Sequence, residues 1–166
     1  MAKGKAESAI PFEVVDALYA AIGIIASAWS IFERWIDTAI WELAGLDKET
    51  GACLTSQIQS VRAKLITVEA LAHLKGASPE TLKDLRRFTN DTEGPTRRRN
   101  MVIHNPIEEV GIDITLRIVS ANRMLIFDNH PITHDDVTAL HKDIMKLIGR
   151  FKAMFSTLGL KSFPSP

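Results

Sequence analysis

The chain has little cysteine and no excess charge of either sign. Cys53 is the only cysteine among 166 residues, which excludes an intrachain disulfide and a multi-cysteine zinc site. Basic and acidic residues both number 20, so the formal net charge is zero. No bulk electrostatic attraction to nucleic acid or to a membrane surface is therefore expected, and any such binding must depend on a local patch. A single cysteine is typical of a reducing compartment, and we expect the protein to be cytoplasmic.

A hydrophobic run of membrane-spanning length is also missing. The longest uncharged apolar stretch, residues 17–32, has 16 residues, whereas a bilayer span needs roughly 20. The residues before it include three acidic side chains against two lysines, which is unlike the positive start of a signal peptide. The sequence therefore predicts neither a membrane span nor a secretory signal.

Apolar side chains at helical spacing are abundant, and the longest series lies near the N-terminus. It predicts one helix that begins at Pro11 and stops at Gly45, because proline suits a first helical turn and glycine a helix end. Its main stripe comprises Leu18, Ile22, Ile25, Trp29, Phe32, Ile36, Ala39 and Leu43. A second stripe comprises Ile24, Ala28, Ile31 and Trp35. One stripe can face the core of the chain, and the second favours burial against a second copy, so a homodimer is expected.

Three further helices are indicated by capping residues. The second is expected to start at Thr55 or Ser56 and to stop at Gly76. The third is expected to start at Ser78, with Pro79 in its first turn. It is interrupted at Gly94-Pro95 by a kink or by a new short helix, and should finish near Asn105 because Pro106 disfavours helical geometry in the residue before it. The last helix is expected to start at Thr133, with Asp136 three residues on.

In residues 111–130 the apolar side chains no longer follow helical spacing and instead alternate with polar ones. Ile112, Ile114, Leu116 and Ile118 alternate with polar residues, residues 120–122 supply a turn, and residues 124–127 return. This pattern predicts a β-hairpin. The expected fold is all-α, an up-down four-helix bundle with a small β-hairpin inserted between helices 3 and 4. Residues 1–166 would form a single domain with flexible tails at 1–10 and 159–166.

Residues 97–106, RRRNMVIHNP, concentrate chemistry in one short stretch. Guanidinium groups match phosphate oxygens, and a histidine both gives and takes protons near neutral pH. On an ideal helix Arg97, Asn100 and His104 share one face, so that a cationic fork, an amide and a proton-transfer group can converge on one ligand. The plainer interpretation is a basic helix end in which the arginines and the histidine favour the helix dipole and cap carbonyls.

The stretch from Arg99 to His104, RNMVIH, resembles the R-N-x-x-x-H signature of HEPN domains. Their general motif is an arginine, four to six intervening residues and a histidine. The family fold is an up-down bundle of four or five helices with the motif near the end of the third helix, and the expected helix count and motif position are similar to it. The resemblance covers most of residues 12–158, and the hairpin would be an insertion.

The resemblance implies metal-independent RNA cleavage of the defence or toxin type, in which a ribose 2′-hydroxyl attacks the adjacent phosphate. By this analogy His104 acts in proton transfer, Arg99 steadies charge on the phosphate, and Asn100 orients the substrate or the arginine. Arg98 and Glu33 are candidate substrate-binding residues. Many family members carry an acid in the first helix, so Glu33 is expected either to pair with an arginine of residues 97–106 or to be simply exposed, and Asp37 on the same helix face is a lesser candidate for the same role. Family members usually build the site across a homodimer, and toxin-type members can have a neutralising protein partner.

The identity of the motif arginine stays open between three neighbours. Arg97 and Arg98 also satisfy the four-to-six spacing to His104. The family pattern favours Arg99, because Asn100 follows it. Helical geometry favours Arg97, because Arg99 points roughly 140° away from His104 on an ideal helix.

Several alternatives to a nuclease remain. Many HEPN proteins are inactive modules that bind nucleotide or a partner protein, and a purely structural helical dimer would also fit the sequence. No cofactor is expected, since no Gly-rich phosphate loop is present. A metal site is not expected either, because Pro131 separates His130 from His134, and His141 follows seven residues after His134.

Overall fold

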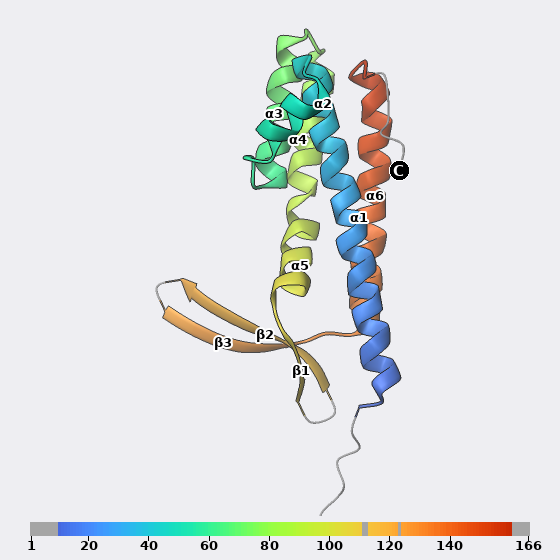
Figure 1. Cartoon of the computed structure of the whole chain (residues 1–166), viewed down its shortest axis with the longest axis vertical. Coiled ribbons are helices and arrows are strands. Elements are labelled where there is room, and N and C mark those ends of the chain that lie inside the picture. The colour runs from blue at the N-terminus through green and yellow to red at the C-terminus, as the bar shows by residue number, and fades with distance from the viewer. Residues whose placement is uncertain (1–9, 111–112, 123, 161–166) are drawn as a thin grey trace, which may run out of the picture. The chain divides into compact units, whose positions relative to one another are not determined.

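A computed structural model describes residues 10–110, 113–122 and 124–160 of the chain. In these ranges the protein is mostly helical with one small antiparallel sheet (Figure 1). The elements in order are α1 (Phe12–Ala44), α2 (Lys48–Thr55), α3 (Val61–Leu74), α4 (Pro79–Asp91), α5 (Glu93–His104), β1 (Ile107–Val110), β2 (Asp113–Asn122), β3 (Met124–Pro131) and α6 (His134–Thr157).

The predicted hairpin belongs to a larger sheet than the sequence indicated. It is confirmed as β2 and β3, but β1 adds a third strand, and the order is β1-β2-β3 (Figure 1). Along the chain, the three strands follow α5 and precede α6. Because the protein contains a three-stranded sheet, the predicted all-α class was too narrow. The turn expected at residues 120–122 was wrong, because these residues pair with residues 124–126 as part of the ladder. Of the residues in the predicted hairpin, 111, 112 and 123 lie outside the described ranges.

Most helix ends lie where their capping residues predicted. The Ser78 hydroxyl accepts from the Thr81 N–H at 3.1 Å, and α4 follows with Pro79 in its first turn. Gly45 and Gly76 follow α1 and α3 with φ of 69° and 81°, a left-handed conformation that residues with a Cβ seldom adopt. The predicted stops at both glycines are confirmed.

The start of the second predicted helix was wrong. Residues 48–55 form a separate helix, α2, which the sequence pattern did not reveal. The cap of α3 is Ser60, whose hydroxyl accepts from the Ala63 N–H at 3.1 Å. The capping-box spacing of Ser56 and Gln59 therefore had no structural counterpart. Ser56 instead follows α2, and its hydroxyl donates to the Cys53 carbonyl at 2.9 Å.

The described chain groups into two compact units, and α1, α5 and α6 each contribute to both. The first unit takes in the chain up to Ala26 and residues 97–142. It contains the sheet, most of α5 and the first part of α6. Its buried apolar side chains are Leu18, Ile25, Val102, Leu116, Ile132, Val137 and Leu140. This grouping does not test the prediction of a single domain. Of the predicted tails, only residues 10, 159 and 160 lie within the described ranges.

The second unit, residues 27–96 and 143–166, is built around aromatic rings. Phe32 is fully buried. Its ring meets Trp29, Phe88 and Phe151 edge to face, with centroid distances of 5.5, 6.2 and 6.0 Å. Phe88 stacks on Phe151 at 5.6 Å. These geometries are the favourable ones for aromatic pairs, so this cluster joins α1, α4 and α6 within the unit.

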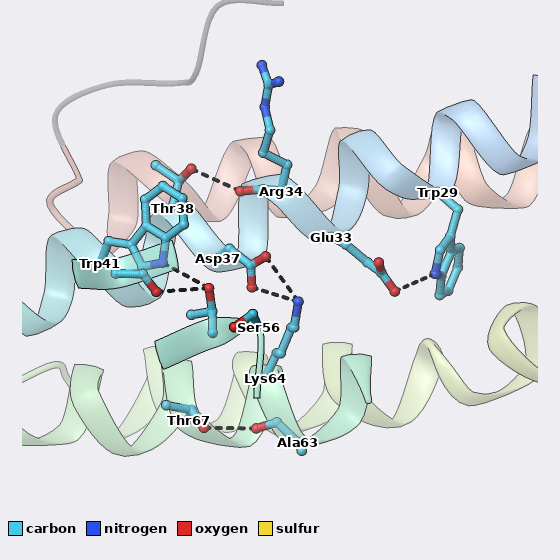
Figure 2. Close-up of polar contacts among 12 residues, drawn as sticks. Trp29, Glu33, Arg34, Asp37, Thr38, Trp41, Ser56, Ala63, Lys64 and Thr67 are labelled. Atoms are coloured by element: carbon cyan, nitrogen blue, oxygen red, sulfur yellow. Dashed lines mark hydrogen bonds and ion pairs between the residues drawn. The ribbon is translucent and has the colours of Figure 1, made fainter. Parts of the chain in front are cut away.

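A polar seam also joins α1 to α2 and α3 in the second unit (Figure 2). Lys64 Nζ lies 2.8 Å from Asp37 Oδ1, and both side chains are largely buried. Trp41 Nε1 donates to Thr55 Oγ1 at 3.1 Å. The Trp41 ring lies on Gly51 so closely that a Cβ there would be 2.5 Å from Trp41 Cδ1. A glycine in α2 therefore permits the approach of the indole.

The first helix is long and apolar enough over part of its length to cross a membrane. Length and composition alone define that test, and core helices and signal sequences also meet it. The cytoplasmic location therefore stays a prediction. Of the second stripe on α1, Ile24 and Ile31 are 55% and 45% exposed, whereas Ala28 is buried and Trp35 is half-buried. The expectation that Ala28 faces outward was wrong.

Candidate functional site

The arginine-rich stretch forms α5, a helix of its own. Gly94 and Pro95 lie in its first turn, where a missing N–H costs little. The prediction left a kink and a new helix open, and the structure has a new helix. It ends at His104 because the Asn105 side chain donates to the Met101 carbonyl at 2.7 Å and Pro106 follows.

The chain leaves α5 directly into the sheet. The carbonyl of Pro106 accepts a hydrogen bond from the Arg117 N–H of β2 at 2.9 Å. Arg117 also pairs with Glu108 of β1, with Nη1 to Oε1 at 3.0 Å. The last turn of α5 is thus held on its C-terminal side by two successive residues, Asn105 and Pro106. This fixes the backbone next to His104.

Arg99 is the arginine that meets His104. Its Nη1 lies 3.3 Å from His104 Nε2 and 3.0 Å from Asn100 Oδ1. Arg99 is half-buried, whereas Asn100 and His104 are exposed. The structure therefore gathers three of the predicted catalytic residues, Arg99, Asn100 and His104, into one contact group at the end of α5. We call these three residues the motif group.

The contact constrains the histidine tautomer. A guanidinium only donates hydrogen bonds, so the bond between Arg99 Nη1 and His104 Nε2 requires a lone pair on Nε2. The neutral imidazole that carries its proton on Nδ1 satisfies this requirement. In that form Nε2 could accept a proton from a substrate hydroxyl only after Arg99 has released this lone pair.

The helical-wheel argument that favoured Arg97 was wrong about reach. The wheel describes Cβ directions, which place Arg99 on another face of α5 from His104. The Arg99 side chain is long enough to reach around the last turn of α5 and contact the imidazole of His104. Arg97 is exposed, and Arg98 is half-buried and turned to a separate pocket. The roles predicted for these two arginines stay predictions.

Two acidic residues of α1, Glu33 and Asp37, have partners within the second unit. Glu33 Oε1 accepts from Trp29 Nε1 at 2.9 Å, one turn earlier on the same helix (Figure 2). Asp37, the second acid on this face of α1, pairs with Lys64 of α3 (Figure 2). These contacts give both carboxylates a structural explanation, and substrate binding by Glu33 stays a prediction.

The remaining histidines form no metal-binding cluster in the part of the chain that the structure describes. No group of three His, Cys, Asp or Glu side chains in those ranges has the proximity needed to hold a metal ion. His134, for example, lies 3.5 Å through Nδ1 from the Thr138 hydroxyl. Cys53 is a free, exposed thiol.

A pocket of about 210 Å³ lies in the first unit, where α5, the end of β3 and the start of α6 meet. Met101, Val102, Ile132 and Leu140 supply apolar walls. Arg98, His130 and Asp136 supply polar groups. In the sequence, Arg98 is a neighbour of the motif arginine, His130 is one of the histidines considered as metal ligands, and Asp136 belongs to the cap of the last helix. Only the sheet register and the packing of α6 bring them together, so no local pattern revealed the pocket.

Asp136 is held in place by the cap of α6, as the sequence predicted. Its Oδ2 accepts from the Thr133 hydroxyl at 2.6 Å and from the Thr133 N–H at 2.9 Å. In return its own N–H donates to the Thr133 hydroxyl at 3.2 Å. The pKa of Asp136 is lowered, first by the Thr133 hydroxyl and N–H and further by the charge of His130. The pocket therefore presents an ionised, oriented carboxylate at neutral pH.

Comparison with known proteins identifies no relative: no family model, curated protein or solved structure matches the chain.

Proposed function

We propose that the protein is a metal-independent RNA endonuclease of the HEPN type. The observation that supports this is the contact of Arg99 with His104 at 3.3 Å. It pairs a permanent cation that binds phosphate with an imidazole whose Nε2 becomes a proton acceptor once the guanidinium turns to the phosphate. Both are held on a helix end that carries the R-N-x-x-x-H sequence.

The reaction would be an internal transesterification of RNA. The ribose 2′-hydroxyl gives its proton to His104 Nε2, and its oxygen forms a bond to the adjacent phosphorus. The bond from phosphorus to the 5′-oxygen breaks, and that oxygen takes a proton from water. The products are a 2′,3′-cyclic phosphate and a free 5′-hydroxyl, and the imidazolium then returns its proton to solvent.

Arg99 would stabilise the charge that gathers on the phosphate oxygens during this step. Its fork can turn from Nε2 to the phosphate as the substrate arrives, which frees the imidazole for proton transfer. Asn100, which accepts from Arg99 at 3.0 Å, would orient the guanidinium. Arg97 is exposed on the same helix and would add phosphate contacts.

The mostly helical fold is compatible with this proposal. The four main helices α1, α3, α4 and α6 would form the up-down bundle of the family, and the sheet would be an insertion after the motif helix. Exposed apolar residues on α1 such as Ile31, 45% exposed, would be covered by a second copy of the chain. A cytoplasmic location and a neutralising protein partner belong to the same proposal.

The decisive experiment uses labelled RNA and excess chelator, and compares the wild-type protein with His104→Ala. His73→Ala is the matched control, because His73 is also an exposed histidine in the last turn of a helix. We expect chelator-resistant cleavage that leaves cyclic phosphate ends, lost in His104→Ala and retained in His73→Ala.

Other results would support the rival functions. Absence of cleavage together with nucleotide binding that depends on the arginines favours an inactive HEPN module. Absence of both, with Ile31→Arg converting dimers to monomers, favours a structural dimer. Cleavage that survives in His104→Ala, or that requires a divalent metal, contradicts the proposed mechanism.

A further inference from the structure

The pocket between α5, β3 and α6 has the composition of a site for a small flat ligand. Leu140, Ile132 and Val102 are 1%, 5% and 6% exposed, so its floor is formed by core side chains. Its volume of about 210 Å³ is below the range of roughly 300–1,000 Å³ that is usual for drug-sized ligands. A single ring system is the size of ligand that such a space admits.

The polar side chains at the pocket restrict the chemistry of the ring. Asp136 presents acceptors only, because its carboxylate is ionised and both of its bonds to Thr133 use Oδ2. A carboxylate offers about four lone-pair sites, which leaves acceptors for ligand N–H groups. Arg98 lines the same pocket and can only donate hydrogen bonds. His130 lines it too, and its ring nitrogens can donate or accept them. A matching ligand presents N–H donors and a carbonyl acceptor on one edge.

We propose that this pocket binds a nucleobase of the RNA substrate, with guanine preferred. Guanine is the RNA base whose Watson–Crick edge carries two adjacent N–H donors, which suit the lone-pair sites of Asp136 Oδ1 that the bonds to Thr133 do not use, and a neighbouring carbonyl oxygen, which suits Arg98 or His130. Its purine faces would lie against Met101 and Leu140. Cytosine and adenine present one amino group beside an acceptor nitrogen, and uracil presents one N–H between two carbonyls.

The pocket and the motif group share a helix. Arg98 and Met101 of α5 line the pocket, while Arg99 and His104 of the same helix form the contact described above. A guanine held in the pocket would place its nucleotide next to the motif group. The role of the pocket as a specificity subsite rests on the proposed ribonuclease function, whereas binding of the base itself does not.

The first test measures binding without any cleavage. The four nucleoside 5′-monophosphates and ribose 5-phosphate are titrated into the full-length protein by calorimetry, with methyl NMR signals of Leu140 and Ile132 as site markers. GMP should bind at least about tenfold more tightly than UMP, because uracil offers the carboxylate one N–H where guanine offers two. The two methyl signals should shift. Equal binding of all four nucleotides and ribose 5-phosphate would overturn the proposal.

Two variants locate the binding site. Ala139 lines the pocket and is exposed on α6, so Ala139→Trp should fill the space and reduce GMP affinity at least about tenfold. Ala153→Trp is the control, because Ala153 is exposed on the same helix in the second unit. Asp136→Asn keeps an acceptor for Thr133 but loses one carboxylate oxygen, and should remove the preference for GMP over the other nucleotides while thermal unfolding confirms a folded protein.

The outcomes separate this inference from the proposed function. GMP binding that Ala139→Trp abolishes, in a protein that cleaves no RNA, supports the pocket and contradicts the nuclease. RNA cleavage without preference for a guanosine neighbour, with binding unchanged in Ala139→Trp, supports the nuclease and contradicts the pocket. If both hold, Ala139→Trp should relax the sequence preference of cleavage, whereas His104→Ala should abolish cleavage without weakening GMP binding.

Discussion

The two compact units differ in what their charged and aromatic side chains contact. In the second unit the aromatic rings of Phe32, Phe88 and Phe151 meet each other in the core, and the buried charges Asp37 and Lys64 neutralise each other. In the first unit Arg98 lines a pocket together with histidine and carboxylate groups, and His104 is exposed beside Arg99. The second unit is built for stability, and the first carries groups that can act on a ligand.

This difference gives a working rule for the whole chain. Substitutions in the second unit should change the free energy of unfolding, because its side chains find their partners within the protein. Substitutions in the motif group should change ligand chemistry with a smaller effect on stability, because Asn100 and His104 are exposed and Arg99 is only half-buried. The predictions below test that separation.

The largest expected effect is the loss of the central ring of the second unit. Phe32→Ala removes a fully buried side chain and should lower the free energy of unfolding by about 3–5 kcal/mol. Phe12→Ala, at a position 78% exposed, should change it by less than about 0.5 kcal/mol. Urea unfolding followed by circular dichroism measures both. A loss below about 1 kcal/mol for Phe32→Ala would show that the aromatic cluster does not organise this unit.

The next effect is expected on catalysis alone. Arg99→Ala should reduce RNA cleavage about 100-fold or more, which is typical when a donor to a transition-state charge is removed, with urea unfolding unchanged. Arg99→Lys keeps the charge but loses the planar fork and should recover only part of the rate. Arg87→Ala, at an exposed position on α4, is the control. A larger loss in Arg97→Ala than in Arg99→Ala would contradict our choice of motif arginine.

A smaller effect is expected at the contact between α1 and α2. Gly51→Ala places a Cβ 2.5 Å from Trp41 Cδ1 and Cγ, so the indole must shift, at a cost of about 1–3 kcal/mol in unfolding free energy. Gly149→Ala is the matched control in α6, where an added Cβ meets no atom of the described chain within 4 Å. That change should stabilise by roughly 0.5–1 kcal/mol. Equal effects of the two substitutions would mean that Trp41 does not lie on Gly51 in solution.

The smallest expected effect is the loss of stability when acid protonates a helix-capping aspartate. One such aspartate lies in each unit, Asp47 in the second and Asp136 in the first. The pKa of Asp47 is lowered by the Thr50 N–H and hydroxyl, and that of Asp136 by the Thr133 hydroxyl and N–H. A folded-state pKa below the ordinary value of 3.8 for an aspartate means that each cap contributes its stability above about pH 4 and loses it as pH falls through the folded value.

Thermal unfolding from pH 6 to pH 2.5 checks this sign. The wild-type protein should be more stable than Asp47→Ala and Asp136→Ala at pH 6, and both differences should shrink towards pH 2.5. Differences that grow towards acid would mean that the carboxyl groups are favoured in their protonated forms when folded.

Much of the fold was predictable because local chemistry decides where a helix begins and ends. Ser78 and Thr133 cap α4 and α6 through contacts that span three residues, and Gly45 and Gly76 adopt left-handed φ. The missed helix α2 shows the opposite case. Its sequence, KETGACLT, has no apolar stripe, and it is held by the distant Trp41 through Thr55 and Gly51.

The strand β1 was missed for a similar reason. It has four residues, IEEV, two of them charged, and only its register with β2, which pairs Ile107 with Leu116, gives it a place in the sheet. A short strand of this kind depends on partners later in the chain. The longer alternation of β2 was sufficient on its own to predict the hairpin.

The site residues were predictable in identity but not in arrangement. The sequence pointed to Arg99, Asn100 and His104, and the structure brings them together. It left the motif arginine open between three neighbours, because a helical wheel gives the directions of the side chains and ignores their length, and the structure shows the contact of Arg99 with His104. The pocket was beyond sequence reasoning, since His130 and Asp136 belong to elements whose meeting is set by tertiary packing.

The hydrogen bond from the Arg117 amide to the Pro106 carbonyl provides a spectroscopic sensor next to the motif group. This amide proton belongs to β2, but its acceptor lies two residues after His104. Its NMR frequency should therefore respond when an anion or an RNA fragment engages the imidazole, and its slow exchange with deuterium would report on fraying of the helix end. This one resonance could therefore be used to follow ligand binding at the motif group in real time, including in variants that have no catalytic activity.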